Sequence, residues 1–405
     1  MNSEIKQRIE QIKNGEIPNG YTATKAGVLP KWDCVRLNQI AEPITKIVGN
    51  GTYETLSISA GIGFVNQAKK FGKELSGKQY EKYTVLKRGD FSYNKGNSKT
   101  YPQGCIYRLK DRETAAVPNV FESFKIKKDS PDYYEQLFTS GYLNKQLSKK
   151  INHGVRDNGL LNLTEKDFYS CYVPHPPIAE QQKIAEILMQ CDKLIELYQN
   201  ETDELQKLKK ICLCNMFPKN GNDVPEWRFP QFTDSWEQRK LGDLLQTLPF
   251  KQFLKEPEPD GKYEIIQQGN EPVIGFANGT PCGDYKDVVI FGDHTLSLYK
   301  PQHPFFVATD GVRIVKGQQD TDGYYLPSLL ERYKPQSEGY KRYYIILADT
   351  NCITTYNTSE QEKIGVFFKL LDNLITLHQH KLEEMKKYKK SLMQLLLTGI
   401  VRVQA

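Results

Sequence analysis

The sequence predicts a mixed α/β fold in which two globular domains are separated by two long antiparallel coiled-coil helices, related by a pseudo-twofold axis. Two observations support this prediction. A polar segment with helical periodicity occurs twice, and each copy follows a region rich in β-branched and aromatic runs broken by glycine, asparagine and aspartate. We therefore expect a first domain over 1–176, a helix over 177–217, a second domain over 218–357, and a second helix with a C-terminal tail over 358–405.

The helical repeat is the strongest internal signal in the chain. The run Glu180-Gln181-Gln182-Lys183-Ile184 returns 180 positions later as Glu360-Gln361-Glu362-Lys363-Ile364, and the offset holds without a gap to Phe217 and Leu397. Neither copy contains an interior proline or glycine, apart from Gly365 near the start of the second. The motif Thr358-x-x-Gln361 predicts a capping box at the start of the second helix.

Apolar residues in both copies fall on heptads, which predicts that the two helices pair. The first copy has the seams Ile184, Cys191, Tyr198, Leu205, Cys212 and Ile187, Leu194, Glu201, Leu208, Asn215; the second has Ile364, Leu371, His378, Met385, Leu392 and Phe367, Leu374, Lys381, Tyr388, Leu395. Antiparallel pairing would match Ile184 with Leu395, Leu194 with Met385, Leu205 with Leu374, and Glu201 with His378. The last pair forms a central polar layer, a feature that can fix register.

Composition narrows the class of protein without deciding its function. The 405 residues are 39% hydrophobic and 26% charged, with a net charge of +6, which permits nucleic-acid binding but does not argue for it. The N-terminus has no apolar leader and no apolar run is long enough to span a membrane, so we expect a cytoplasmic protein with no membrane partner. The eight cysteines are scattered without a Cys-x-x-Cys pair, as expected of reduced thiols.

Several catalytic motifs are missing. No P-loop motif occurs, and the His175-Pro176-Pro177 run lacks the preceding asparagine or aspartate needed to hold an amino group for methyl transfer. The six histidines show no zinc-binding spacing. His294 beside Asp293 is the best enzyme candidate, but adjacent side chains on a strand point to opposite faces. We therefore predict no catalytic residue and no metal or cofactor on this chain.

Polar loops in both domains combine residue types suited to DNA. Asparagine and glutamine can read adenine, arginine and lysine can read guanine or hold phosphate, and tyrosine can pack on sugar or base. The same composition also fits ordinary solvated loops. The candidates are Tyr93, Asn94, Lys95, Lys99, Tyr101, His153, Arg156 and Asn158 in the first domain, and Gln267, Gln268, Asn270, His294, Thr295, Arg313, Tyr340, Lys341 and Arg342 in the second.

The two domains are related but unequal. Trp32-Asp33-Cys34-Val35-Arg36-Leu37 resembles Trp236-Glu237-Gln238-Arg239-Lys240-Leu241. Trp32 precedes Glu180 by 148 positions, whereas Trp236 precedes Glu360 by only 124. If both domains bind DNA, this difference predicts two different half-sites and an asymmetric target.

The whole plan resembles the specificity subunit of type I restriction-modification enzymes. The resemblance rests on motifs that together are specific. They are Asn162-Leu163-Thr164-x-x-Asp167-Phe168 leading to Pro174-x-Pro176-Pro177-x-x-Glu180-Gln181-Gln182-Lys183-Ile184-Ala185, Glu360-Gln361-Glu362-Lys363-Ile364-Gly365, Gly89–Lys95, Phe291–Thr295 and Asp310-Gly311. The second domain departs from the pattern, because it enters its helix through Thr354–Thr358 without prolines, and the C-terminus differs from the end of the first helix.

The resemblance implies a division of labour. Each target-recognition domain would read one half of a split double-stranded DNA target, and the helices would form the spacer. Two copies of a methyltransferase subunit would dock there and methylate adenine, and a restriction subunit with motor and nuclease would complete the enzyme. S-adenosylmethionine, Mg and ATP would bind those partners. Two alternatives stay open: a coiled-coil scaffold with two protein-binding heads, and an independent nuclease or hydrolase acting through His294.

Overall fold

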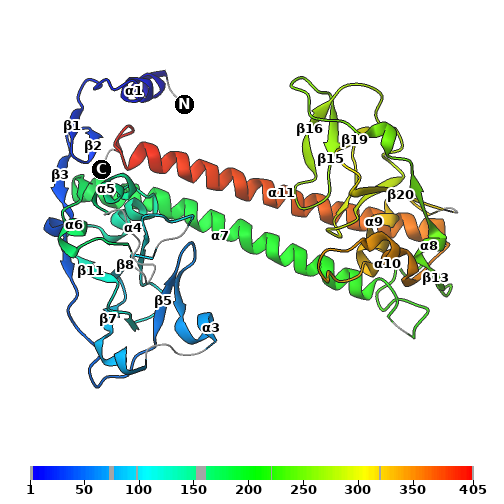
Figure 1. Ribbon diagram of the computed structural model, residues 1–405, viewed down its shortest axis with the longest axis horizontal. Helices are drawn as coiled ribbons and strands as arrows, with labels where there is room; N and C mark the ends of the chain where they lie inside the picture. Colours follow the sequence, from blue (N-terminus) through cyan, green and yellow to red (C-terminus); the bar gives the residue numbers. More distant parts are fainter. Residues whose placement is uncertain are drawn as a thin grey trace. The chain divides into compact units, whose positions relative to one another are not determined.

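The computed structural model describes residues 3–72, 77–96, 99–151, 161–219, 221–318 and 321–403. The chain divides into two compact units (Figure 1). Unit 1 comprises Met1–Glu196 together with Glu383–Ala405, and unit 2 comprises Leu197–Leu382. Each unit therefore contains one predicted domain and a segment of both long helices.

Unit 1 is built on an antiparallel four-stranded sheet with the order β4-β11-β8-β9. The pairs β1–β2, β3–β12, β5–β6 and β7–β10 complete its strands. The strands are β1 (Thr22–Thr24), β2 (Gly27–Leu29), β3 (Asp33–Arg36), β4 (Ala41–Pro43), β5 (Leu56–Ser59), β6 (Gly63–Asn66), β7 (Thr84–Lys87), β8 (Phe91–Asn94), β9 (Cys105–Arg108), β10 (Thr114–Val117), β11 (Glu122–Ile126) and β12 (Tyr172–His175). The short helices are α1 (Ser3–Lys13), α2 (Leu37–Ile40), α3 (Gln67–Phe71), η1 (Gly77–Lys82), α4 (Pro131–Thr139), α5 (Asn144–Lys150) and α6 (Glu165–Tyr169).

Unit 2 has an antiparallel four-stranded sheet with the order β14-β20-β17-β18. A three-stranded sheet, β16-β15-β19, and the pair β13–β21 complete its strands. The strands are β13 (Glu237–Lys240), β14 (Leu245–Leu248), β15 (Tyr263–Ile266), β16 (Val273–Ala277), β17 (Val288–Gly292), β18 (Leu298–Tyr299), β19 (Phe305–Val307), β20 (Val312–Gly317) and β21 (Asn351–Thr354). The short helices are α8 (Leu241–Leu244), η2 (Lys251–Phe253), α9 (Tyr325–Tyr333) and α10 (Tyr343–Asp349).

The two units share one internal plan. In each, a short helix leads into the outer strand of the four-stranded sheet, α2 into β4 and α8 into β14. A later helix, α4 or α9, carries a fully buried tyrosine, Tyr133 or Tyr325. Local signals explain these helices: Pro131 opens α4, and the Ser130 hydroxyl accepts a hydrogen bond from the Tyr133 amide at 3.3 Å. The predicted mixture of helices and strands is therefore confirmed.

The predicted repeat folds as two long helices, α7 (Ile178–Asn215) and α11 (Thr358–Leu396). The predicted capping box is wrong in detail. The Asn357 side chain, one residue before α11, accepts the Glu360 amide hydrogen bond at 3.1 Å, while the Gln361 side chain bonds the Asp322 amide and the Thr355 carbonyl. Asparagine suits this position because its short side chain reaches the free amides of the first turn.

One heptad seam in each helix was assigned correctly and the other was not. Cys191 and Cys212 are buried on α7, as are Ile364 and Leu371 on α11, in agreement with the first seams. The second seams are shifted by one residue. Leu194 and Leu374, which the sequence places in these seams, are 41% and 40% exposed. The residues buried instead lie one position later in the heptads: Leu188, Thr202, Phe368, Ile375 and Leu382. Leu194 and Leu374 are therefore not core residues. Of the other predicted spacer residues, Ile184 is fully buried and Leu205, Met385 and Leu395 are half-buried.

Contacts between α7 and α11 occur within both units. In unit 1, the Lys389 ammonium lies 2.5 Å from an Asp192 carboxylate oxygen, and in unit 2, Lys209 lies 2.5 Å from Asp372. These two ion pairs join residues that are equivalent in the repeat. Also in unit 2, His378 Nδ1 lies 3.1 Å from a Glu201 carboxylate oxygen. The predicted contact between Glu201 and His378 is thus confirmed.

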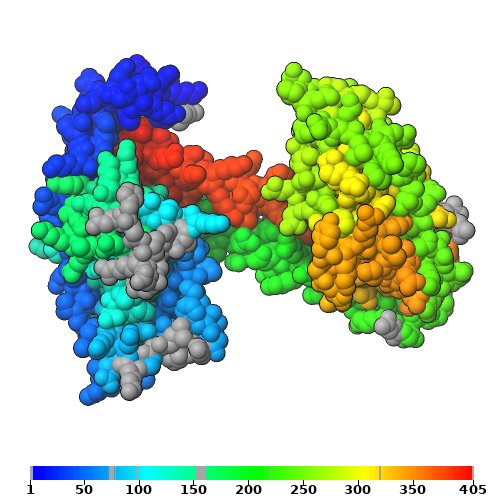
Figure 2. All heavy atoms as spheres, in the orientation of Figure 1, coloured from blue at the N-terminus to red at the C-terminus, as the bar shows by residue number. Residues whose placement is uncertain are grey.

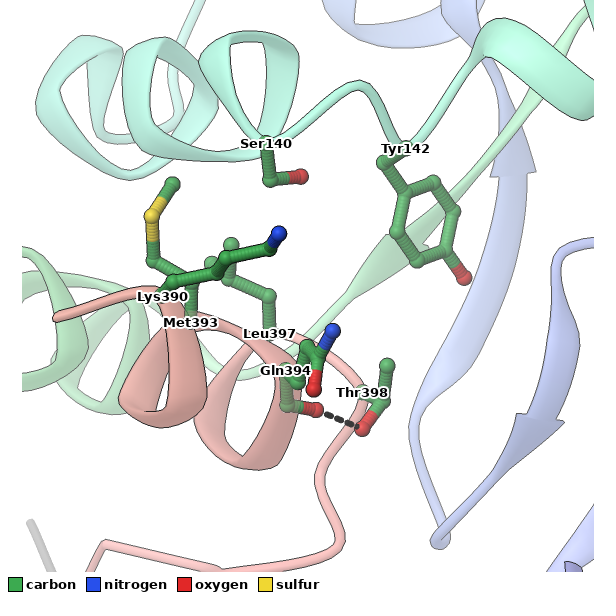
Figure 3. A pocket seen from close by; sticks show the side chains of 7 residues that line it. All are labelled: Ser140, Tyr142, Lys390, Met393, Gln394, Leu397 and Thr398. Atoms are coloured by element: carbon green, nitrogen blue, oxygen red, sulfur yellow. Dashed lines mark hydrogen bonds between the residues drawn. The ribbon is translucent and has the colours of Figure 1, made fainter. Parts of the chain in front are cut away.

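Unit 1 also holds a cavity of about 190 Å³ beside the last turns of α11 (Figure 3). Tyr142, Met393 and Leu397 supply its apolar wall, and Lys390 and Ser140 line it with polar groups. Among the described residues, no helix has the length and apolar character needed to cross a bilayer.

Candidate nucleic-acid interface

The loop between β17 and β18 is the centre of the candidate interface in unit 2. Asp293, at its start, is almost fully buried, and its carboxylate accepts bonds from the Arg313 guanidinium at 3.0 and 3.2 Å and from the Tyr344 amide at 2.9 Å. The guanidinium of Arg313 is therefore committed to holding this loop. We interpret Arg313 as a positioning residue rather than as a direct reader of bases.

His294 joins three of the predicted loops. Its backbone amide donates to the Gln268 side chain at 3.0 Å, and its Nδ1 lies 2.9 Å from the Lys341 carbonyl oxygen. The Tyr340 ring stacks on the imidazole with centroids 4.4 Å apart and planes 7° apart. The structure thus brings together segments near positions 268, 294 and 341 that are distant in sequence.

The tip of this cluster is exposed. Tyr340 is 85% exposed despite its contact with His294, and Asn270, Thr295, Lys341 and Arg342 are also exposed, whereas Gln267 is half-buried and bonds the Glu271 carbonyl. The neighbouring Ile345, on α10, is a large exposed apolar side chain that the sequence analysis missed. Figure 2 shows the α9–α10 region, coloured orange, at the surface of unit 2. An exposed ring, two cations and two small polar groups suit contact with DNA.

In the predicted loop that begins at Tyr93, fewer side chains are available for DNA contact than the sequence suggests. Tyr93 is fully buried on β8, stacks on Phe168 at 4.8 Å between ring centroids, and donates its hydroxyl hydrogen bond to the Gln103 carbonyl. A side chain without exposed surface cannot contact DNA, so this assignment is wrong. Burial also raises the pKa of Tyr93 well above its ordinary value. Lys95 is paired with Glu122 at 2.5 Å, and both are largely buried.

An exposed turn of unit 1 lies between β5 and β6, outside the predicted loops. Gly61, at φ +82°, donates its amide hydrogen bond to the Tyr107 hydroxyl at 2.8 Å, and a Cβ there would lie 3.4 Å from the Tyr101 hydroxyl. The Asn94 amide reaches the Ile58 carbonyl at 3.4 Å, so it braces this turn. Ile62, Lys99 and Thr100 are exposed. His153, Arg156 and Asn158 lie outside the described residues.

Each unit also contains a buried glutamate held by a tryptophan and an arginine. In unit 1, Glu180 accepts from Trp32 Nε1 at 3.0 Å and from the Arg402 guanidinium at 2.6 and 2.7 Å. In unit 2, Glu360 accepts from Trp236 Nε1 at 3.2 Å and from the Arg228 guanidinium at 2.7 and 2.9 Å. The two glutamates that mark the sequence repeat therefore have the same structural role.

His294 and Asp293, the enzyme candidates of the sequence, both take part in the bonds that hold the loops. One nitrogen of His294 is occupied by a backbone carbonyl, and the neighbouring Asp293 carboxylate is bonded to Arg313 and to a backbone amide. Within the described ranges, no group of three or more His, Cys, Asp or Glu side chains is arranged to hold a metal ion.

Comparison with known proteins agrees with the fold and the motifs. Residues 31–207 match the model of the type I restriction modification DNA specificity domain. The chain is 24% identical to the MjaX type I restriction enzyme specificity subunit of Methanocaldococcus jannaschii, over 99% of this chain and 93% of that protein. It is also 24% identical to the MjaVIII specificity subunit of the same organism, over 66% and 70% of the two chains.

A solved structure extends the comparison to the fold. The S subunit of a type I restriction-modification system from M. genitalium superimposes with a TM-score of 0.62 at 15% identity, covering 94% of this chain and 98% of that one. The match includes both units and both long helices, since it leaves out only a small part of the chain. Residues 31–207 thus carry the type I restriction modification DNA specificity domain, and the chain as a whole is similar in sequence to type I specificity subunits and shares the fold of a solved S subunit.

Proposed function

We propose that the domains at 1–176 and 218–357 each read one half of a bipartite, asymmetric DNA target. The observation that carries this proposal is a repeated scaffold with unequal tips. The two four-stranded sheets and the two buried glutamate sites correspond, while the exposed residues at the tips differ in type. A scaffold that is held constant while its tip varies is suited to reading two different sequences.

The exposed residues support different modes of reading. In the second domain, Arg342 and Asn270 carry donors that match guanine and adenine edges, and Tyr340 offers a flat surface for a base or sugar. In the first domain, Ile62 and Lys99 offer an apolar contact, such as one with a thymine methyl group, and a phosphate contact. Gln268, Arg313 and Asn94 act indirectly by holding the loops.

We further propose that α7 and α11 form an antiparallel coiled-coil spacer with a pseudo-twofold axis. Support comes from the order of contacts within unit 2: Tyr198 lies near Lys381, Glu201 near His378, and Lys209 near Asp372, so that numbers fall on α11 as they rise on α7. The reciprocal ion pairs, Asp192 with Lys389 and Lys209 with Asp372, support the twofold relation. A helix of this length spans roughly 57 Å, more than one turn of B-DNA.

Partner binding is the second part of the proposal. Apolar side chains are exposed at equivalent positions of both long helices. Leu197 and Leu377 are each 49% exposed, and Leu194 and Leu374 are 41% and 40% exposed. Two equivalent apolar surfaces suit two copies of one partner. We assign these surfaces to two methyltransferase subunits. Those subunits would bind S-adenosylmethionine, and a restriction subunit would bind ATP and Mg, so this chain has no catalytic role and works in the cytoplasm with the DNA.

The proposal is tested by mapping methylated adenines in DNA from cells that carry the chain with its partner subunits. We expect a split motif with two different halves and a fixed gap. Tyr340→Ala combined with Arg342→Gln should relax one half, at about 1–3 kcal/mol for each lost base contact, and leave the other intact. Ile62→Ser combined with Lys99→Gln should affect only the other half.

The matched control is Arg239→Gln, which changes an exposed arginine of unit 2 outside the three loops. It should leave both halves of the motif unchanged. If DNA with scrambled half-sites is methylated as well as the native target, the proposal fails. The chain would then be better described as a scaffold with protein-binding heads.

A further inference from the structure

Lys300 occupies, in unit 2, the position that Arg108 occupies in unit 1. Arg108 lies opposite Phe91 in the β8–β9 ladder of the first sheet. In the second sheet Tyr299 lies opposite Ile290, so Lys300, the next residue, continues the equivalent β17–β18 ladder opposite Val289. Both cations therefore lie at equivalent positions of the ladder formed by the outer strand of each four-stranded sheet.

The surroundings of the two cations differ in charge. Arg108 is paired with two carboxylates of α4, Asp132 at 2.5 Å and Glu135 at 3.4 Å. The equivalent helix α9 can be aligned with α4 through the buried Tyr133 and Tyr325, and it then places Tyr324 and Pro327 at the positions of the two acids. Unit 2 thus has a half-buried cation at this position without either of the carboxylates.

A cavity lies where the missing carboxylates would be. Lys300, Pro327 and Ser328 line two cavities of about 60 and 100 Å³ in unit 2. The smaller cavity has room for a few water molecules or one phosphate-sized oxyanion. Ser328 stands at the position of Gln136, whose longer side chain bonds Asp192 in unit 1.

A second cation, Lys369, lines the smaller of these two cavities. The Lys369 ammonium lies 3.9 Å from the centre of the Tyr324 ring, and Lys300 lies 5.4 Å from it. Among the residues that the structure describes, neither ammonium has a carboxylate within ion-pair distance. Two acids line the cavities and are already engaged: Asp372, which lines both, is paired with Lys209, and Glu331, which lines the larger one, is paired with Lys334. Of the other nearby acids, Asp287 is paired with Lys316, and Asp322 accepts from the Tyr324 and Tyr325 amides.

We propose that Lys300 and Lys369 bind a phosphate-sized oxyanion in this cavity. Two unpaired cations beside one cavity repel each other, and an anion between them removes the repulsion and replaces the lost carboxylates. The Lys300 ammonium already donates to the Lys286 and Val288 carbonyls at 2.5 and 3.0 Å, so it is held in place for the ligand. This proposal does not depend on the proposed reading of DNA.

The electrostatics of Lys300 agree with an anion site. Burial lowers the pKa of its ammonium to about 8, and Lys369 lowers it further, although Asp287 and Asp322 act in the opposite direction. A bound oxyanion would raise the pKa of Lys300 toward its ordinary value, because an opposite charge nearby favours the charged form.

The test measures binding of inorganic phosphate to the full chain, by titration calorimetry and by thermal unfolding against chloride at equal ionic strength. We expect phosphate to raise the unfolding midpoint of the native chain in a saturable way. Lys300→Met and Lys369→Met should each abolish the effect. Lys110→Met, which removes a cation of unit 1 that is paired with Glu135, should leave it intact. A shift of equal size in all variants would be a general salt effect, and it would overturn the proposal, as would no shift in the native chain.

A gain of charge provides an independent check. Pro327→Glu restores the carboxylate that unit 1 carries at Glu135, and glutamate is well tolerated in the first turn of a helix. This variant should no longer bind phosphate although it folds, and retention of binding would contradict the proposal. Competition identifies the source of the ligand: if a non-specific DNA duplex displaces phosphate, the site holds a DNA backbone phosphate, and if it does not, the site holds a free anion.

Discussion

The two buried glutamates allow the same interaction to be broken in each unit of one chain. Arg228→Met removes the guanidinium from Glu360, and Arg402→Met removes it from Glu180. Each variant leaves a buried carboxylate with the indole N–H of its tryptophan as the remaining side-chain donor. The two arginines differ in one respect, because the Arg228 side chain is 13% exposed and that of Arg402 is 44% exposed.

This difference sets the expected magnitudes. Removing one partner of a buried ion pair costs about 3–5 kcal/mol, which we expect for Arg228→Met in unit 2. Water already screens the interaction of the more exposed Arg402 with Glu180, and it can hydrate the carboxylate when the guanidinium is removed. We therefore expect Arg402→Met to destabilise unit 1 by about 1–2 kcal/mol. In a unit of this size, each kcal/mol lowers the unfolding midpoint by about 2–4 °C.

Hydrogen exchange measured by mass spectrometry, together with calorimetry, can assign the loss to a unit. Exchange should rise around Trp236 in Arg228→Met and, to a smaller extent, around Trp32 in Arg402→Met. Arg239→Met, which breaks an exposed pair with Glu237, is the control and should change stability by less than about 0.5 kcal/mol. Equal effects of Arg228→Met and Arg239→Met would refute the reasoning.

Three further predictions follow from the structure. Lys300 should contribute increasing stability as pH rises from about 8 toward 10.5, because the unfolded chain then binds the Lys300 proton that the folded chain has lost, whereas the buried cysteines, whose pKa values burial raises, lower stability over the same range; in urea denaturation the difference in stability between the native chain and Lys300→Met should therefore grow with pH. Tyr93→Phe should cost about 1 kcal/mol in thermal unfolding, through one lost buried hydrogen bond, without changing the methylated motif. Leu197→Asp or Leu377→Asp should each remove one methyltransferase subunit from the complex in native mass spectrometry, whereas Asn200→Asp, an exposed polar control, should not.

The long helices could be predicted from the sequence because their periodicity is unbroken and occurs twice. The choice of buried face could not, because apolar residues occupy neighbouring positions such as Leu194 and Ile195. Periodicity gives two apolar stripes of similar strength in that case, and only packing against the partner decides between them. The exposed stripe is the one that we assign to partner binding.

The candidate interface was predictable where loops are polar and rich in glycine. The loops near His294 and Tyr340 were found in this way, and the structure brings them together. The turn at Gly61 was missed because it is very short and carries the apolar Ile62. Tyr93 was misassigned because it adjoins a polar run, although strand alternation turns its ring into the core.

The tail that supplies Arg402 also sets the order in which the two units can be completed during synthesis. Unit 2 is a single continuous stretch, Leu197–Leu382, whereas unit 1 requires residues after Glu383, among them Leu396 and Leu397 in its core. A ribosome releases the chain from its N-terminus, so the half made first must wait until the residues after Glu383 have been translated. Until then Glu180 lacks its arginine, and a chain that stops before Arg402 would leave its first domain unfinished.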